Sequence, residues 1–197
     1  DDARERDRAT DDAGDSDSSG WIDSDGDGLS DRAERASIGP LADADPMRTD
    51  VFVEIDYVGI ENPERITDEF QVVVERFENA PVDNPDGSRG IDLHLVLDER
   101  LPPEQIDYRA HVNGEINTED WDYGDVGYHY AIVDTTRTGR AFAKYGRMVL
   151  VREHIDSLSE TFMHELGHSL GIFADVYRGV DSRQVPASEY PSIMNYN

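Results

Sequence analysis

The spacing of hydrophobic and polar positions changes several times along the chain, and each change predicts a different element. Residues 51–58 and 128–134 are rich in β-branched and aromatic side chains, which is typical of strands. Residues 91–99 alternate between apolar and polar positions, and 147–153 form another short apolar block, so both are also predicted to be strands. Residues 139–146 are a possible edge strand between the last two.

Two segments have the 3.6-residue period of a helix. In the first, the apolar residues 66, 70, 73, 74 and 77 fall on one face. The second covers 157–172, where Gly171 stands at the position of a helix end. The order of strand, helix, several strands and helix predicts a three-layer α/β (α+β) domain over 51–197.

The first fifty residues have a different character. Residues 1–20 hold eight acids and three Arg but no apolar side chain larger than Ala, which predicts a disordered acidic leader. Residues 21–38 read as a separate loop-and-helix module. Gly39-Pro40 and Asp45-Pro46 then indicate a linker over 39–50.

Charge and composition exclude several classes of function. The chain has 44 Asp and Glu against 18 Lys and Arg, a net charge of −26, and its single Lys is Lys144. This acidity disfavours a nucleic-acid partner and favours a protein of a high-salt environment. No apolar run approaches the roughly 18 residues of a membrane span. Cys is absent, so neither a disulfide nor a thiolate ligand is available.

The strongest chemical signal is His164-Glu165-Leu166-Gly167-His168. Four residues apart on a helix, the two imidazoles lie on one face and can direct a nitrogen at one zinc ion. Glu165 lies about 100° further round the helix, where it can reach a zinc-activated water as a general base. The remaining histidines lack mutual spacing and are expected to be structural: His94, His111, His129 and His154.

The segment HELGHSLG (164–171), followed by SIMNY (192–196), resembles the metzincin clan of zinc endopeptidases. The resemblance implies a metzincin-like three-layer domain with a twisted mixed sheet, a backing helix and an active-site helix. It makes Met194 a hydrophobic floor under the metal and 139–146 an edge strand that pairs with extended polypeptide substrate. Tyr196 would bind the zinc or stabilise the oxyanion, although it can equally be a buried aromatic residue.

The third zinc ligand departs from the clan pattern. The clan has a His or Asp three residues after the glycine, but this chain has Ala174. Asp175 is the favoured ligand because a one-residue bulge would bring it to the metal. Asp181 is the next candidate, and a water or another group is the remaining alternative.

A second metal motif lies in the N-terminal module. Its residues match positions 1, 3, 5, 7, 9 and 12 of an EF-hand-type calcium loop, with Gly28 at the sharp turn. The predicted calcium ligands are Asp23, Asp25, Asp27, Leu29 through its carbonyl, Asp31 and Glu34. A single loop of this kind resembles the thrombospondin type 3 and dockerin-like repeats of extracellular proteins.

The sequence therefore predicts a secreted, calcium-stabilised zinc endopeptidase with Glu165 and Tyr196 as its catalytic residues. Its expected partners are polypeptide substrates, with neither nucleic acid nor membrane, and its oligomeric state is open. The alternative is a calcium-stabilised extracellular binding module whose zinc site lacks peptidase activity, a hypothesis that Ala174 favours.

Overall fold

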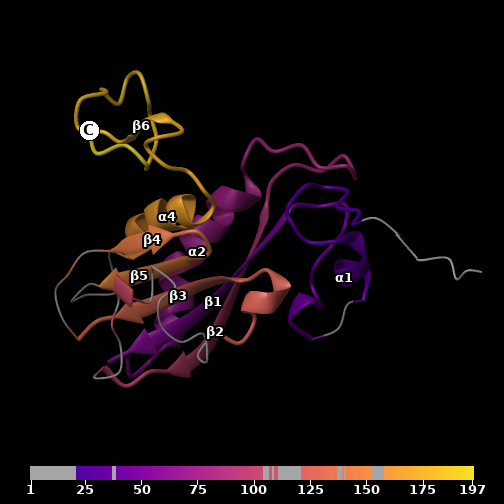
Figure 1. Ribbon diagram of the computed structural model, residues 1–197, viewed down its shortest axis with the longest axis horizontal. Helices are drawn as coiled ribbons and strands as arrows, with labels where there is room; N and C mark the ends of the chain where they lie inside the picture. Colours follow the sequence, from indigo (N-terminus) through magenta and orange to yellow (C-terminus); the bar gives the residue numbers. More distant parts are fainter. Residues whose placement is uncertain are drawn as a thin grey trace, which may run out of the picture.

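The computed structural model of the protein describes residues 21–36, 39–103, 107, 109–110, 121–136, 139, 141–151 and 158–197. Its centre is a five-stranded sheet in the order β2-β1-β3-β5-β4 (Figure 1). The first four of these strands are parallel, and β4 runs antiparallel to β5. The predicted mixed α/β class is therefore confirmed. The strands are β1 (Asp50–Val58), β2 (Asp92–Arg100), β3 (His129–Asp134), β4 (Phe142–Lys144) and β5 (Arg147–Val151).

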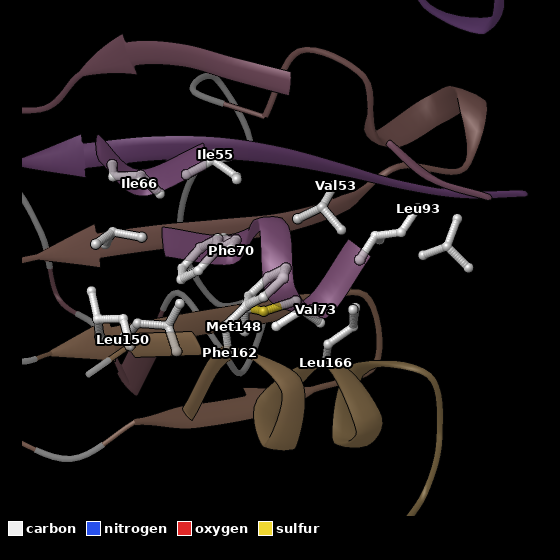
Figure 2. Close-up of a cluster of buried hydrophobic side chains, with 14 of the residues drawn as sticks. Val53, Ile55, Ile66, Phe70, Val73, Leu93, Met148, Leu150, Phe162 and Leu166 are labelled. Carbon is white, nitrogen blue, oxygen red and sulfur yellow. The ribbon is translucent and has the colours of Figure 1, made fainter. Parts of the chain in front are cut away.

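Two helices cover one face of the sheet. They are α2 (Glu64–Glu78) and α4 (Leu158–Ser169), which match the two predicted helices. Phe70 of α2 and Phe162 of α4 stack with their ring centroids 4.1 Å apart, and neither ring is accessible to solvent (Figure 2). Val53 and Ile55 of β1 close the cluster from the sheet side. Burial of each such side chain stabilises the fold by about 1.5–3 kcal/mol, which fixes α4 against the sheet.

The opposite face of the sheet is covered partly by the N-terminal residues. Leu29, Leu41, Phe52 and Tyr128 form one buried cluster that joins the predicted calcium loop and linker to β1 and to the residue before β3. The short helix α1 (Asp31–Arg35) and the 3-10 turn η1 (Gly39–Leu41) lie in this region. The 3-10 turn η3 (Gly124–Val126) comes just before β3. Leu29 and Leu41 thus attach the N-terminal residues to the sheet.

The chain turns sharply where α4 ends. Gly171 has a φ of +92°, and the backbone N–H groups of Gly171 and Ile172 donate to the carbonyls of His168 and Gly167. This confirms the predicted helix end, since glycine adopts the left-handed conformation without strain. Residues 171–197, including β6 (Arg178–Asp181), form a lobe beyond α4 (Figure 1).

Some sequence predictions fall outside the described residues. These are the acidic leader 1–20, Ser157 at the start of the second predicted helix, and the two histidines His111 and His154. Among the residues that are described, no helix combines the length and the apolar character needed to cross a membrane.

Candidate metal centres

Helix α4 brings the two histidines of the motif together. Phe162 and Leu166 point into the core and are fully buried, which turns the opposite positions of the helix towards the C-terminal lobe. His164 and His168 are 7% and 8% exposed, and their Nε2 atoms are 3.1 Å apart. The helical spacing therefore places both ring nitrogens at one point, as predicted.

Both imidazoles are oriented by main-chain carbonyl groups. His164 Nδ1 lies 2.9 Å from the carbonyl oxygen of Ile193, and His168 Nδ1 lies 2.8 Å from that of Ile172. A carbonyl oxygen only accepts, so each Nδ1 carries a hydrogen, which leaves Nε2 as the nitrogen that can bind a metal. Two lone pairs facing each other at 3.1 Å repel unless a cation lies between them. Such carbonyl contacts are the usual outer support of metal-binding histidines.

The third member of the cluster is Asp181. Its Oδ1 lies 3.3 Å from His164 Nε2 and 3.4 Å from His168 Nε2. Zinc bonds of 2.0–2.1 Å in a tetrahedron separate neighbouring ligand atoms by roughly 3.3 Å. The three atoms thus form a triangle with the dimensions of one face of a zinc tetrahedron. Two neutral nitrogens and one carboxylate oxygen are also a donor set that zinc favours.

Asp181 is held in this position by an unusual backbone. Its φ of +54° is the one positive value at a non-glycine residue within the described ranges. The conformation is uncommon outside glycine, although Asp tolerates it better than most residues. The Asp181 N–H donates to the carbonyl of Met194 at 2.7 Å, so the end of β6 is tied to the SIMNY segment.

The favoured prediction of Asp175 as third ligand is not what the geometry gives. Asp175 is exposed and lies in a turn in which the N–H groups of Val176 and Tyr177 donate to the Phe173 carbonyl. Among the described residues, Asp175 shares no group of potential metal ligands with the two histidines. The alternative ligand, Asp181, is the carboxylate that joins them.

Met194 lies against the helix at the middle of the motif. It is 3% exposed, and a Cβ atom added to Gly167 would come within 2.5 Å of its sulfur. The thioether of Met194 thus fills the space beside Gly167, which lies between His164 and His168 on the helix. Met194 therefore packs against the helix between the two histidines, and its part as a floor under a metal stays a prediction of the family resemblance.

Two further polar side chains border the three ligand atoms. Glu165 is 7% exposed, and burial, with a smaller contribution from the charge of Asp181, raises its pKa to about 7. Tyr196 Oη lies 3.2 Å from His164 Nε2, and its ring stacks on the His164 ring. Burial and the nearby Asp181 raise the pKa of Tyr196 to about 12, so the phenol keeps its proton at neutral pH. The pair offers a proton acceptor and an O–H donor beside the ligands.

The other described histidines lie away from this centre. His94 Nε2 is 2.6 Å from Asp50 Oδ1, and its ring stacks on Phe52. His129 Nδ1 lies 2.7 Å from the hydroxyl of Ser169 at the end of α4. Both have contacts that account for them structurally, in line with the sequence prediction.

The predicted calcium loop folds around its first three aspartates. Carboxylate oxygens of Asp23, Asp25 and Asp27 lie within 4.8 Å of one another. Asp23 accepts hydrogen bonds from the N–H groups of Gly26 and Gly28, two glycines with positive φ. One oxygen of Asp25 is shielded from solvent and has no hydrogen-bond partner among the described residues, which suits an oxygen reserved for a cation.

A second group extends the loop to the sheet. Asp27, Glu34 of α1 and Asp50 of β1 also have carboxylate oxygens within 4.8 Å of one another. The Asp50 N–H donates to Asp27 at 2.9 Å, and Asp50 is 4% exposed. Sequence reasoning missed Asp50, because the EF-hand spacing ends at Glu34 and nothing in a strand-forming segment singles out its first residue.

Asp31, another predicted calcium ligand, belongs to none of the potential metal-binding groups of the described residues. Its carboxylate accepts from the N–H and hydroxyl of Ser24, at 2.8 and 2.9 Å, and forms an ion pair with Arg35 at 2.8 Å. Asp31 is the first residue of α1, and its bonds to Ser24 hold the start of the helix against the loop. Leu29 was also predicted to be a calcium ligand, through its carbonyl oxygen. Its side chain packs in the cluster with Phe52.

Two carboxyl groups of the loop have pKa values above their usual range. Burial and the neighbouring Asp27 raise the pKa of Asp25 to about 6. Burial and the charges of Asp27, Asp25 and Asp50 raise the pKa of Glu34 to about 8. Like charges held this close oppose ionisation of one another. A divalent cation coordinated by oxygen atoms removes that opposition, and these donors are of the type that calcium takes.

A third acidic group, Glu54, Asp56 and Asp98, has a structural explanation. Glu54 accepts hydrogen bonds from the N–H groups of Asp122 and Tyr123. Asp56 accepts from the hydroxyl of Tyr130 at 2.5 Å. The bonds to Glu54 anchor the segment before β3 to β1, and the bond to Asp56 links β3 to β1.

Comparison with known proteins adds no assignment. No protein-family model and no curated protein matches the chain.

Proposed function

We propose that the protein is a secreted zinc endopeptidase that acts on polypeptides and is stabilised by calcium. The observation that carries the proposal is the triangle of His164 Nε2, His168 Nε2 and Asp181 Oδ1, with edges of 3.1, 3.3 and 3.4 Å. Glu165, buried beside it, supplies the base that such a centre needs for hydrolysis. The metzincin-like motif and the sheet order, with its antiparallel edge strand, support the same proposal.

Each residue has a distinct part in the proposed reaction. When bound, zinc supplies Lewis-acid chemistry by polarising the scissile carbonyl and acidifying a water molecule. His164, His168 and Asp181 would hold the ion. Glu165 takes the proton from the attacking water and delivers it to the leaving amine. Tyr196, protonated at neutral pH, donates a hydrogen bond to the negative charge that develops on the carbonyl oxygen.

Calcium has a structural part in the proposal. Asp23, Asp25, Asp27, Glu34 and Asp50 are the carboxylates that would hold it. Asp50 belongs to β1, so the ion would join the N-terminal loop to the first strand of the sheet. The net charge of −26 and the single Lys support a high-salt, extracellular location, where calcium is plentiful and salt screens the repulsion.

Metal analysis combined with a hydrolysis assay tests the proposal. The full chain is loaded with zinc and calcium and incubated with an unfolded, generic protein substrate over a range of salt concentrations. We expect one zinc per chain and hydrolysis that stops when zinc is chelated and returns when it is restored. A zinc-loaded protein that cleaves none of many substrates overturns the peptidase proposal and favours the binding module instead.

A further inference from the structure

The segment around β4 has a charge opposite to that of the rest of the chain. Residues 135–152 contain five cationic side chains and neither Asp nor Glu. A stretch of 18 residues with the average composition would hold about four acids, since the chain has 44 in 197. Lys144, the only lysine of the protein, lies within this stretch. A depletion of this kind in a strongly acidic chain calls for a local cause.

Lys144 lies at the edge of the sheet. β4 pairs with β5 and with no other strand of the described residues, so its outer edge is available for pairing. Ala143 packs towards the core beneath α4, whereas Phe142 and Lys144 are on the other face of the strand. Lys144 is exposed and forms no ion pair within the described ranges.

The end of β4 is connected to the zinc centre by direct contacts. The N–H of Gly146, in the turn after β4, donates to the carbonyl of Ser169 at 3.2 Å. The ring of Tyr145 packs edge-on against Phe173 at 4.9 Å, and Phe173 stacks on His168 at 5.5 Å. A polypeptide paired with the outer edge of β4 would therefore lie beside the C-terminal end of α4 (Figure 1).

We infer that β4 binds acidic segments of polypeptide and that Lys144 determines this specificity, an inference that rests on the proposed peptidase function. A substrate strand added to the edge places one side chain directly across from Lys144, close enough for a cross-strand ion pair. The remainder of the protein, with its large negative charge, repels acidic chains. The acid-free stretch is the place where such a chain can approach the site.

The opposite edge of the same sheet tests a simpler explanation, in which the charge on β4 only prevents aggregation. Exposed edges carry charge to prevent aggregation, and either sign serves that purpose. β2, the other edge strand, carries Asp92, Asp98 and Glu99. Acids predominate on β2, although it ends at Arg100, so the lysine of β4 calls for another reason. Arg100, exposed at the end of β2, is the matched control position.

The experiment uses internally quenched peptides that differ only in having Glu, Gln or Lys at successive positions around one scissile bond. With the zinc- and calcium-loaded wild type, we expect kcat/KM to be highest for Glu at one position, mainly through a lower KM. Lys144→Glu should reverse the preference and change the Glu-to-Lys ratio on the order of tenfold, while Lys144→Gln removes it. Arg100→Glu, with the same change in net charge, should keep the wild-type ratio. The preference should also weaken as salt rises towards 1 M.

Two results would overturn the inference, and both differ from failure of the peptidase proposal. One is equal cleavage of the three peptides by the wild type, and the other is an equal effect of Lys144→Glu and Arg100→Glu. Binding of the same peptides to zinc-loaded Glu165→Gln, followed by fluorescence anisotropy, provides a readout that is independent of turnover. If no peptide is hydrolysed but the Glu peptide still binds more tightly through Lys144, the acidic docking edge stands and the peptidase proposal falls.

Discussion

The two candidate metal centres are assembled in the same way but depend on their ions differently. Each combines a short local motif with one carboxylate from a separate strand, Asp181 of β6 in one and Asp50 of β1 in the other. At the zinc centre, backbone carbonyls and a strained φ hold the three side chains in place. In the calcium loop, the buried carboxylates repel one another. We therefore expect zinc to determine activity and calcium to determine stability.

The largest expected effect is at Glu165. Replacement by Gln removes the proton acceptor but keeps the size of the side chain, so turnover should fall by about 10²- to 10⁴-fold. Zinc content and melting temperature should stay near those of the wild type, because Glu165 is not one of the three ligands. Hydrolysis rates, metal analysis and thermal unfolding measure the three quantities. A variant with normal turnover would show that another group accepts the proton.

The next largest effect distinguishes the two candidate third ligands. Asp181→Asn should weaken zinc binding by on the order of a hundredfold, since even residues that only support ligands account for 10- to 100-fold. Asp175→Asn is the matched control and should bind zinc normally, because Asp175 lies in an exposed turn. Competition with a chelator of known affinity measures both constants. The reverse order of the two variants would restore Asp175 as the ligand.

A third prediction concerns pH and His129, which contacts Ser169 at the end of α4. Burial lowers the pKa of His129 to about 4 from its usual 6.5. Between these values the unfolded chain binds a proton that the folded chain does not, so stability is complete above 6.5 and falls as the pH decreases. Between pH 7.5 and 5 this loss amounts to about 2 kcal/mol.

The measurement compares denaturant unfolding of the wild type and His129→Gln across that pH range, with both metals present. The variant lacks the titrating ring, so its free energy of unfolding should decrease less on acidification. Parallel curves for the two proteins would mean that His129 is not buried as described.

The smallest effect tests whether calcium joins the loop to the sheet. Asp50→Asn should reduce calcium affinity roughly tenfold, about 1.4 kcal/mol, and lower the melting temperature more with calcium than without it, because Asp50 also contacts His94. Asp31→Asn should leave calcium affinity unchanged but destabilise the protein with or without the ion, because Asp31 bonds to Ser24 and Arg35. Calorimetric titration and thermal unfolding separate the two. Calcium binding that depends on Asp31 rather than Asp50 would return the loop to its sequence-based description.

Sequence was informative wherever the chemistry depends on near neighbours. Helical periodicity is enough to place His164 and His168 together. Runs of β-branched, aromatic and apolar residues, with alternation in 91–99, are enough to find the strands. The sequence ranked Asp175 above Asp181 because Asp175 lies nearer to the two histidines along the chain. Nearness along the chain is misleading here, because residues 173–177 form a local turn.

The calcium loop shows the same limit. Asp31 has the right spacing, but spacing does not reveal that Ser24 and Arg35 engage its carboxylate. Asp50 has no spacing signal and is brought to the loop by packing of Leu29 against Phe52. Both corrections come from contacts between segments, which depend on the fold of the entire chain rather than on any short pattern.

The close approach of Gly167 and Met194 limits how freely the motif can vary. In a collection of variants randomised at 166 and 167, position 166 should accept other large aliphatic residues that fill the same core space. Position 167 should return almost only glycine, since even one added methyl displaces the buried sulfur. Gly167, a position that the motif leaves unspecified, is therefore among the least replaceable residues of the motif in this chain.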